Sequence, residues 1–411
     1  MRTSPGEEPS VSKLEQLPFD IRHQILLAVD TIADLSALVH ASPTFHQQYL
    51  LSRGIWLRRC LQLELGHIFV DAYTVHLCNS VDFRLKRSRQ QVREFIDAYH
   101  LRCSKATELL SSLSDTEEAI AIVAYYLSTI VPLVSHYVSW TQSNLKNLCV
   151  HEHLSQTENR RIIRGLYRFQ LFCNYLGSGC GDSGSRLNQA ERLGLFLGRY
   201  ESWEIEEVLC INRFADAKYQ RVFDAVQWDF HPDNPRFETE RRDIHTPDGA
   251  FHLDNYAENQ WYRNGINSLG LTVLSAIFNA NDHSKLVETV SKNMVLLGED
   301  WIVETSDSFT LRSRHEDWNS ERERAQDDRQ EMSFKGDRDD LPPLAWVSIW
   351  KGTCSNICGY CIPDSLREWG YVMWDSSRLI DSGAMAILDQ QWRAMYGRDD
   401  DEETDDPRDD L

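Results

Sequence analysis

The sequence has little positive charge and lacks a recognisable nucleotide-binding motif. Its 411 residues hold 43 Lys and Arg against 63 Asp and Glu, for a net charge of −20. This balance repels phosphate backbones, so we expect no nucleic-acid binding, and a partner steered by charge should be basic. The chain has no GxxxxGK[ST] phosphate loop and no GxGxxG segment between a strand pattern and a helix pattern. Nothing therefore favours nucleotide binding.

Export signals and a disulfide framework are also missing. The opening "MRTSPGEEPSVSK" has no apolar core, so we expect no secretory signal. The ten cysteines are scattered, mostly inside apolar helical patterns such as "LRRCLQL" and "FQLFCNYL". Such a distribution is typical of buried, reduced thiols in a cytoplasmic or nuclear protein.

One long segment lacks charge. From Ala119 to Leu145 there is no Lys, Arg, Asp or Glu, and the segment is long enough to span a bilayer. Its Ser, Thr and His residues cost more free energy in lipid than in a protein interior. We therefore expect no membrane span, but a central helix that is buried on nearly all sides, with Pro132 as the candidate site of a kink.

Alternating strand patterns and internal repeats are absent, whereas apolar residues recur at three- and four-residue spacing through most of the chain. The sequence predicts an all-α fold, with short strands conceivable only at Trp346–Trp350 and Gly370–Trp374. Gly177 follows one helical pattern and is a plausible helix end. The segment from Phe230 to His252 has three prolines and a Pro-Asp-Gly turn, so it should be a long loop.

Composition divides the chain into several parts, and its length suggests about two to three domains. We expect residues 1–13, 312–343 and 399–411 to be disordered, because they are polar or densely charged. The last of these carries nine acidic residues against one Arg. Residues 14–61 form a distinct N-terminal module. Residues 62–311 and 344–398 should form one larger helical domain on which the module packs or which follows it.

The module has three well-marked helix starts. Pro18 suits a first helical position, and Asp20 follows in the first turn, where the helix dipole favours a carboxylate. Thr31 and Asp34 fit a capping box, and Ser42 precedes a proline. Three such short helices cannot bury all their apolar surface among themselves. They need the rest of the chain, a partner, or both.

These residues resemble an F-box, the module that docks on the Skp adaptor of cullin–RING ubiquitin ligases. The similarity covers residues 14–61 and is closest to the variant in many fungal F-box-like proteins. A Trp often follows the Ser of the third helix in the family, and here the aromatic residue is Phe45. The matching positions are Leu17, Pro18, Ile21, Ile25, Leu26, Asp34, Leu35, Leu38, Ser42 and Phe45.

The resemblance implies a substrate receptor without chemistry of its own. The module would bind a Skp-type adaptor and through it a cullin, while the larger domain would hold an unknown protein substrate. The adaptor-binding residues it implies are Leu17, Pro18, Ile21, Ile25, Leu35, Leu38 and Phe45. The alternative is a helical scaffold or regulatory protein outside any ligase, in which the three helices are a structural start.

Three motifs that suggest chemistry lack the context it requires. Cys354, Cys358 and Cys361 have the spacing of a radical SAM cluster, but no βα repeats precede them and no fourth zinc ligand lies nearby. "GDSG" at 181–184 lacks a triad scaffold, and "HEH" at 151–153 puts its two histidines on different helix faces. We therefore predict no catalytic residue, no metal site and no cofactor. The alternative at these cysteines is a zinc site completed by a remote ligand such as Cys180 or a histidine.

Overall fold

The computed structural model describes residues 12–79, 88–105, 116–146, 153–177, 187–238, 247–299, 301–306, 332–351 and 361–397. Over these residues the chain forms helices and connecting segments and no strand, which confirms the all-α prediction. Trp346–Trp350 lies in helix α19 (Leu344–Trp350), and residues 370–374 form turns, so the two suggested strands were wrong. Trp346, Ile349 and Trp350 are buried at three- and four-residue spacing, which gives this short segment one apolar helical face.

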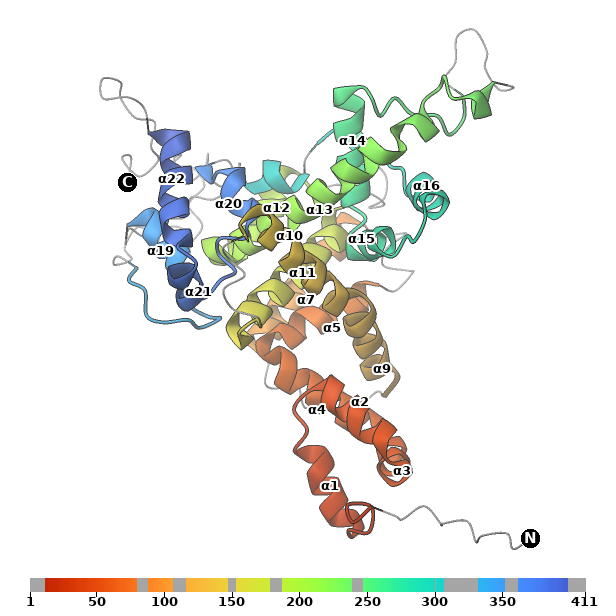
Figure 1. Ribbon diagram of the computed structural model, residues 1–411, viewed down its shortest axis with the longest axis vertical. Helices are drawn as coiled ribbons and strands as arrows, with labels where there is room; N and C mark the ends of the chain where they lie inside the picture. Colours follow the sequence, from red (N-terminus) through yellow and green to blue (C-terminus); the bar gives the residue numbers. More distant parts are fainter. Residues whose placement is uncertain are drawn as a thin grey trace, which may run out of the picture.

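Four helices form the N-terminal part: α1 (Phe19–Leu27), α2 (Ile32–Ala41), α3 (Pro43–Leu51) and α4 (Arg53–Leu65). The first three lie at one end of the molecule, and α4 runs from them towards the main body (Figure 1). Both predicted N-caps form: the Thr31 hydroxyl accepts the Asp34 N–H at 3.0 Å, and the Ser42 hydroxyl accepts the Phe45 N–H at 3.3 Å. The Asp34 carboxylate accepts the Thr31 hydroxyl at 2.7 Å in place of the Thr31 N–H that a capping box would use. Local sequence therefore sets where α2 and α3 begin.

The next helices are η1 (Gly66–Ile68), α5 (Phe69–Cys78), α7 (Arg89–Ser104), α9 (Thr116–Tyr125), the π-helical turn η2 (Tyr126–Ile130) and α10 (Val131–Asn144). The last three make one helix, Thr116–Asn144, which by length and composition alone could cross a membrane. The π-helical turn η2 interrupts the α-helical pattern just before Pro132, the residue at which a kink was expected. Only 44% of its most apolar window is buried, so the expected burial on nearly all sides was wrong.

The centre of the body is the pair α11 (Gln156–Leu176) and α13 (Ser202–Phe230), which pack together (Figure 1). Nearly every residue of α11 from Arg161 to Tyr175 is buried. The helices approach closely at Gly165, where an added Cβ would lie 3.1 Å from the Glu207 carbonyl oxygen. Gly177 ends α11, as predicted.

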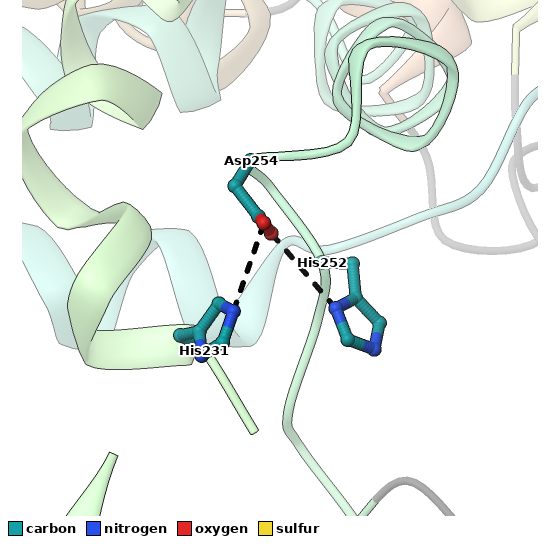
Figure 2. A group of neighbouring side chains, drawn as sticks. All are labelled: His231, His252 and Asp254. Carbon is teal, nitrogen blue, oxygen red and sulfur yellow. Dashed lines mark ion pairs between the residues drawn. The ribbon is translucent and has the colours of Figure 1, made fainter. Parts of the chain in front are cut away.

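Around this pair lie α12 (Gln189–Leu195), η5 (Leu197–Arg199), α14 (Tyr256–Asn267), α15 (Leu271–Phe278) and α16 (His283–Lys292). The segment between α13 and α14 contains one short 3-10 helix, η6 (Pro235–Phe237), and is otherwise irregular where it is described, as predicted. It brings His231, His252 and Asp254 together at the end of α13 (Figure 2).

The C-terminal helices are α19, α20 (Asp364–Glu368), α21 (Ser376–Asp381) and α22 (Ala384–Tyr396). They add Trp346, Trp350, Trp369, Trp374 and Trp392, all nearly fully buried, to a core cluster that also contains residues of the N-terminal helices. Disorder was expected over 312–343, and its part up to 331 is outside the described residues, as are 1–11 and 398–411. The end of that segment, 332–343, is described, and residues 337–339 contact other parts of the chain.

Candidate functional site

The predicted docking residues of α1 lie largely at the surface. Helix α1 turns Leu26 into the core, where it is 1% exposed, and this leaves Ile21 47% exposed on the other side. Pro18 is also exposed, and Leu17 and Ile25 are half-buried. Helix α1 therefore presents an apolar outer face that starts at Pro18.

Leu35 and Phe45 occupy the interior of the module instead. Their side chains are 2% and 1% exposed, and Leu38 is half-buried. In this conformation Leu35 and Phe45 contribute to the protein's own core cluster. They support the outer face from behind and are not available to a partner.

Further exposed hydrophobic residues were missed by the sequence analysis. Phe19 on α1, Leu50 and Leu51 on α3, Ile55 on α4 and the preceding Leu14 are all at least half exposed, and Leu51 reaches 75%. The sequence contained a signal for Leu50: Phe45 and Gln48 face inward at three-residue spacing, and Leu50, five positions after Phe45, lies on the opposite side of the helix. Leu51 continues the inward spacing, so its exposure was not predictable from the pattern. Large apolar side chains gathered in this way are typical of a protein-binding surface.

Polar contacts fix α1 against α3. The Arg22 guanidinium donates to Gln48 Oε1 at 3.1 Å and to the Leu17 carbonyl at 2.6 Å, and the Gln48 amide donates to the Phe19 carbonyl at 3.0 Å. The Ser42 hydroxyl donates to Glu15 Oε1 at 2.6 Å. These bonds hold the two apolar surfaces in one relative position before any partner binds, which lowers the entropy lost on binding.

Helix α4 joins the module to the body. Glu64 accepts the Ile32 N–H at 3.1 Å and the Tyr126 hydroxyl at 2.7 Å, so a single carboxylate links α2 to η2. Arg59 donates to the Leu27 carbonyl at 2.8 Å, and the rings of His23 and Trp56 meet edge to face at 4.8 Å. The orientation of the module is therefore coupled to the main body.

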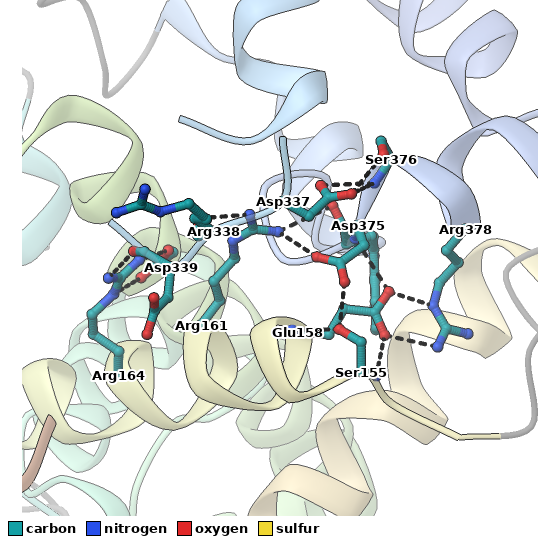
Figure 3. Close-up of polar contacts among 12 residues, drawn as sticks. Ser155, Glu158, Arg161, Arg164, Asp337, Arg338, Asp339, Asp375, Ser376 and Arg378 are labelled. Carbon is teal, nitrogen blue, oxygen red and sulfur yellow. Dashed lines mark hydrogen bonds and ion pairs between the residues drawn. The ribbon is translucent and has the colours of Figure 1, made fainter. Parts of the chain in front are cut away.

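A second constellation, which the sequence analysis also missed, is an ionic network on α11 (Figure 3). Arg164 binds Glu207 through two bonds of 2.5 and 2.7 Å, and Arg161 lies 3.1 Å from Asp375. One turn on, Arg168 lies 3.0 Å from Glu204. The sequence analysis predicted a helix here but assigned no role to these three arginines, all of which are buried.

The network attaches the C-terminal region to α11. Arg378 of α21 binds Glu158 at 2.7 and 2.8 Å, and Glu158 also accepts the Asp375 N–H at 3.1 Å. Arg161 and Arg164 donate to the carbonyls of Arg338 and Asp339 at 3.3 and 2.5 Å (Figure 3). Residues more than 150 positions apart in the chain are thus held together by charged hydrogen bonds.

The network keeps its groups ionised in the interior. Desolvation opposes the charge of Glu204, but Arg168 and Arg164 outweigh it and lower the pKa of this carboxyl to about 2. Desolvation also lowers the pKa of Arg164, yet Glu207 and Glu204 reverse this effect and the pKa is raised. Burial raises the pKa of Glu207, but its two-bond contact is that of a carboxylate with a guanidinium. These charges compensate one another, so the network fixes positions and does not present a reactive group.

The cysteine motifs are partly described. Cys354, Cys358 and "GDSG" at 181–184 lie outside the described residues, as do the first two residues of "HEH". Cys361 is buried, as are Cys60 and Cys210. Burial raises the pKa of the Cys60 thiol to about 11 and that of Cys210 well above its usual value. Both are protonated at neutral pH, as expected of unreactive structural thiols.

Comparisons with known proteins found no family model, no curated protein and no solved structure that matches this chain.

Proposed function

We propose that residues 14–61 dock a Skp-type adaptor and that the rest of the chain holds a protein substrate for a cullin–RING ubiquitin ligase. The observation that carries the proposal is the exposed apolar surface on α1 and α3, made by Phe19, Ile21, Leu50 and Leu51. It lies at the end of the molecule away from the C-terminal helices (Figure 1). An adaptor bound there leaves the larger helical body free for a second protein.

The energetics suit a binding surface of this kind. Burying a large apolar side chain completely is worth about 1.5–3 kcal/mol, so each half-exposed one adds roughly 1 kcal/mol when a partner covers it. Several together can offset the entropic cost of association only if they are already fixed in place. The bonds of Arg22 and Gln48 between α1 and α3 provide that fixation.

In this proposal the protein performs no chemistry. It raises the effective concentration of a substrate near the ubiquitin-conjugating enzyme carried by the cullin, and it orients the two. The cytoplasm or nucleus is the corresponding location, because the ligase partners work there. The net charge of −20 favours a substrate with a basic surface.

The experiment is a binding titration of the full chain with a purified Skp-type adaptor, comparing the wild type with Ile21→Asp and Leu51→Asp. A carboxylate placed in an apolar interface should cost at least about 3 kcal/mol, which weakens binding more than about a hundredfold. Leu101→Asp on α7 is the matched control, since Leu101 is 57% exposed and lies outside the module. Circular dichroism and melting on each variant separate lost binding from lost folding.

Two results would refute docking: a wild-type chain that binds no adaptor, or folded Ile21→Asp and Leu51→Asp variants that bind with wild-type affinity.

The second candidate, a helical scaffold outside any ligase, is favoured by one observation. Leu35 and Phe45 belong to the same core cluster as the main body, as they would in a purely structural start. Adaptor-dependent ubiquitination of a co-purified protein distinguishes the receptor from the scaffold.

A further inference from the structure

We propose that His231, His252 and Asp254 form a binding site for a divalent transition metal, with Zn²⁺ as the ion that the ligands fit best. One ligand atom from each residue lies within 4.8 Å of the other two (Figure 2). The proposal departs from the prediction of no metal site, and it is independent of adaptor docking because the cluster lies outside residues 14–61.

The donor atoms are close to the spacing that a metal requires. His231 Nε2 lies 3.7 Å from Asp254 Oδ2, and His252 Nδ1 lies 3.8 Å from Asp254 Oδ1. Bonds of about 2.0–2.2 Å in a tetrahedral site put neighbouring ligand atoms roughly 3.3 Å apart. Each ring is therefore within about half an ångström of the required distance to one carboxylate oxygen, but the two rings contact different oxygens. Closure around one ion requires the carboxylate to turn and the two histidine rings to approach each other.

The backbone that carries the ligands is already held. The Phe251 N–H donates to the Phe230 carbonyl at 2.7 Å, and this bond joins the residues that precede His252 and His231. Leu253 is buried, and the Asn255 side chain caps α14 by accepting the N–H groups of Ala257 and Glu258. Asp254 is thus placed between two anchored neighbours.

A further carboxylate stands behind one of the rings. His231 Nδ1 accepts the Asp233 N–H at 3.1 Å and lies 3.8 Å from Asp233 Oδ2. When Nε2 binds a metal, the proton of the neutral ring must move to Nδ1. The ring then gives up the bond from the Asp233 N–H, and its Nδ1 proton can face the Asp233 carboxylate instead, in the arrangement that commonly orients a metal-bound histidine.

The ligand set determines the class of ion. Two imidazoles and one carboxylate suit Zn²⁺ and related transition metals, whereas Mg²⁺ and Ca²⁺ prefer oxygen donors. The Asp254 side chain is 55% exposed, so water can supply a fourth ligand. The bound ion would join the C-terminal end of α13 to the segment that leads into α14.

The test is a titration of the metal-free, reduced full chain with Co²⁺, followed by displacement with Zn²⁺. The wild type should bind one equivalent more than His252→Ala or His231→Ala, and this equivalent should show the visible absorption of a low-coordinate Co²⁺ site. Either substitution should weaken Zn²⁺ binding at the site by more than the roughly 10–100-fold that loss of an outer partner costs, and Asp233→Ala should fall within that range. The melting temperature should rise on addition of Zn²⁺ for the wild type and not for His252→Ala.

His283→Ala provides the matched control. His283 Nε2 lies 2.9 Å from Asp229 Oδ2, so it is also a histidine paired with a carboxylate, but it belongs to no three-residue cluster among the described residues. It should keep the full Co²⁺ signal. The proposal is overturned if His231→Ala and His252→Ala bind as many equivalents as the wild type, if Mg²⁺ displaces Co²⁺ as well as Zn²⁺ does, or if His283→Ala abolishes the signal.

Discussion

The N-terminal module and helix α11 place their side chains in opposite ways. The module leaves Phe19, Ile21, Leu50 and Leu51 at the surface, at least 47% exposed. Helix α11, in contrast, buries Arg161 and Arg164 to 1% exposure or less among carboxylates. One region exposes the groups that water disfavours, and the other buries the groups that water solvates best.

The difference shows what each region depends on. Exposed apolar groups have little effect on the stability of the fold. They contribute favourable free energy only when a partner covers them. Buried charges are tolerated only with their partners in place, because an unpaired ion in the interior is very unfavourable. Single substitutions of polar residues should therefore lower the folding stability of the body. Substitutions on the outer face of the module should leave folding stability unchanged and weaken only binding to a partner.

The largest expected effect follows from removing one charge of the network. Arg164→Met leaves Glu207 buried without its two-bond partner, and the free energy of unfolding should fall by about 3–5 kcal/mol in urea denaturation. The double variant Arg164→Met/Glu207→Leu removes both charges and should recover much of that loss. If the free energy of unfolding of the single variant falls by less than about 1 kcal/mol, the stability of the body does not depend on this ion pair. The proposed difference between the two regions would then not hold.

Within the module, Phe45→Ala tests whether its inner and outer residues differ as described. Phe45 is 1% exposed, so its truncation should cost about 3–4 kcal/mol through lost burial and the cavity left behind. Ile21→Ala, at 47% exposure, should change stability by no more than about 0.5 kcal/mol. Equal losses for the two variants in the same denaturation experiment would show that Ile21 belongs to the core.

The network should also impose a dependence on pH. The pKa of Glu204 is about 2 in the folded protein, against an ordinary value of 4.5. Because the folded value is lower, its stabilising effect is complete above pH 4.5 and is lost as the pH falls towards 2. The difference of 2.5 units corresponds to about 3 kcal/mol.

Comparison with Glu204→Gln isolates this contribution from that of other carboxyl groups. The difference in unfolding free energy between wild type and variant should be constant above about pH 5 and narrow by about 3 kcal/mol down to pH 2. A difference that stays constant over this range would mean that Glu204 is not the group that titrates.

Local features were predictable from sequence, whereas long-range pairs were not. The caps at Thr31 and Ser42 and the end at Gly177 depend on neighbouring residues, so a short window contains the whole signal. Arg378 meets Glu158 across 220 positions, and Arg367 meets Glu206 across 161. Only the folded chain brings such residues together, although the spacing of Arg161, Arg164 and Arg168 on an otherwise apolar helix was a sign that these charges are buried.

The burial of the proposed docking residues also depends on contacts outside the motif. The motif placed all seven candidate residues on one module, but it could not separate Ile21, which faces out, from Leu35 and Phe45, which face in. That division depends on how α1 and α3 turn against α4, and the motif pattern contains no information on it. His231 and His252 were likewise 21 positions apart in a segment predicted only as a loop.

The smallest expected effect concerns stability at the most exposed residue of the module. Leu51 is 75% exposed, so Leu51→Ser should leave the free energy of unfolding within about 0.5 kcal/mol of the wild-type value. Self-association should nevertheless fall, because one contributor to the exposed apolar surface is removed; light scattering against concentration measures this.

Leu296→Ser is the matched control, since Leu296 is 54% exposed and lies outside residues 14–61. If both variants change self-association equally, the module contributes no more to self-association than the rest of the surface does. If Leu51→Ser instead destabilises the fold by more than about 1 kcal/mol, the Leu51 side chain already serves the core, and only Leu50 is left on α3 for an adaptor to cover.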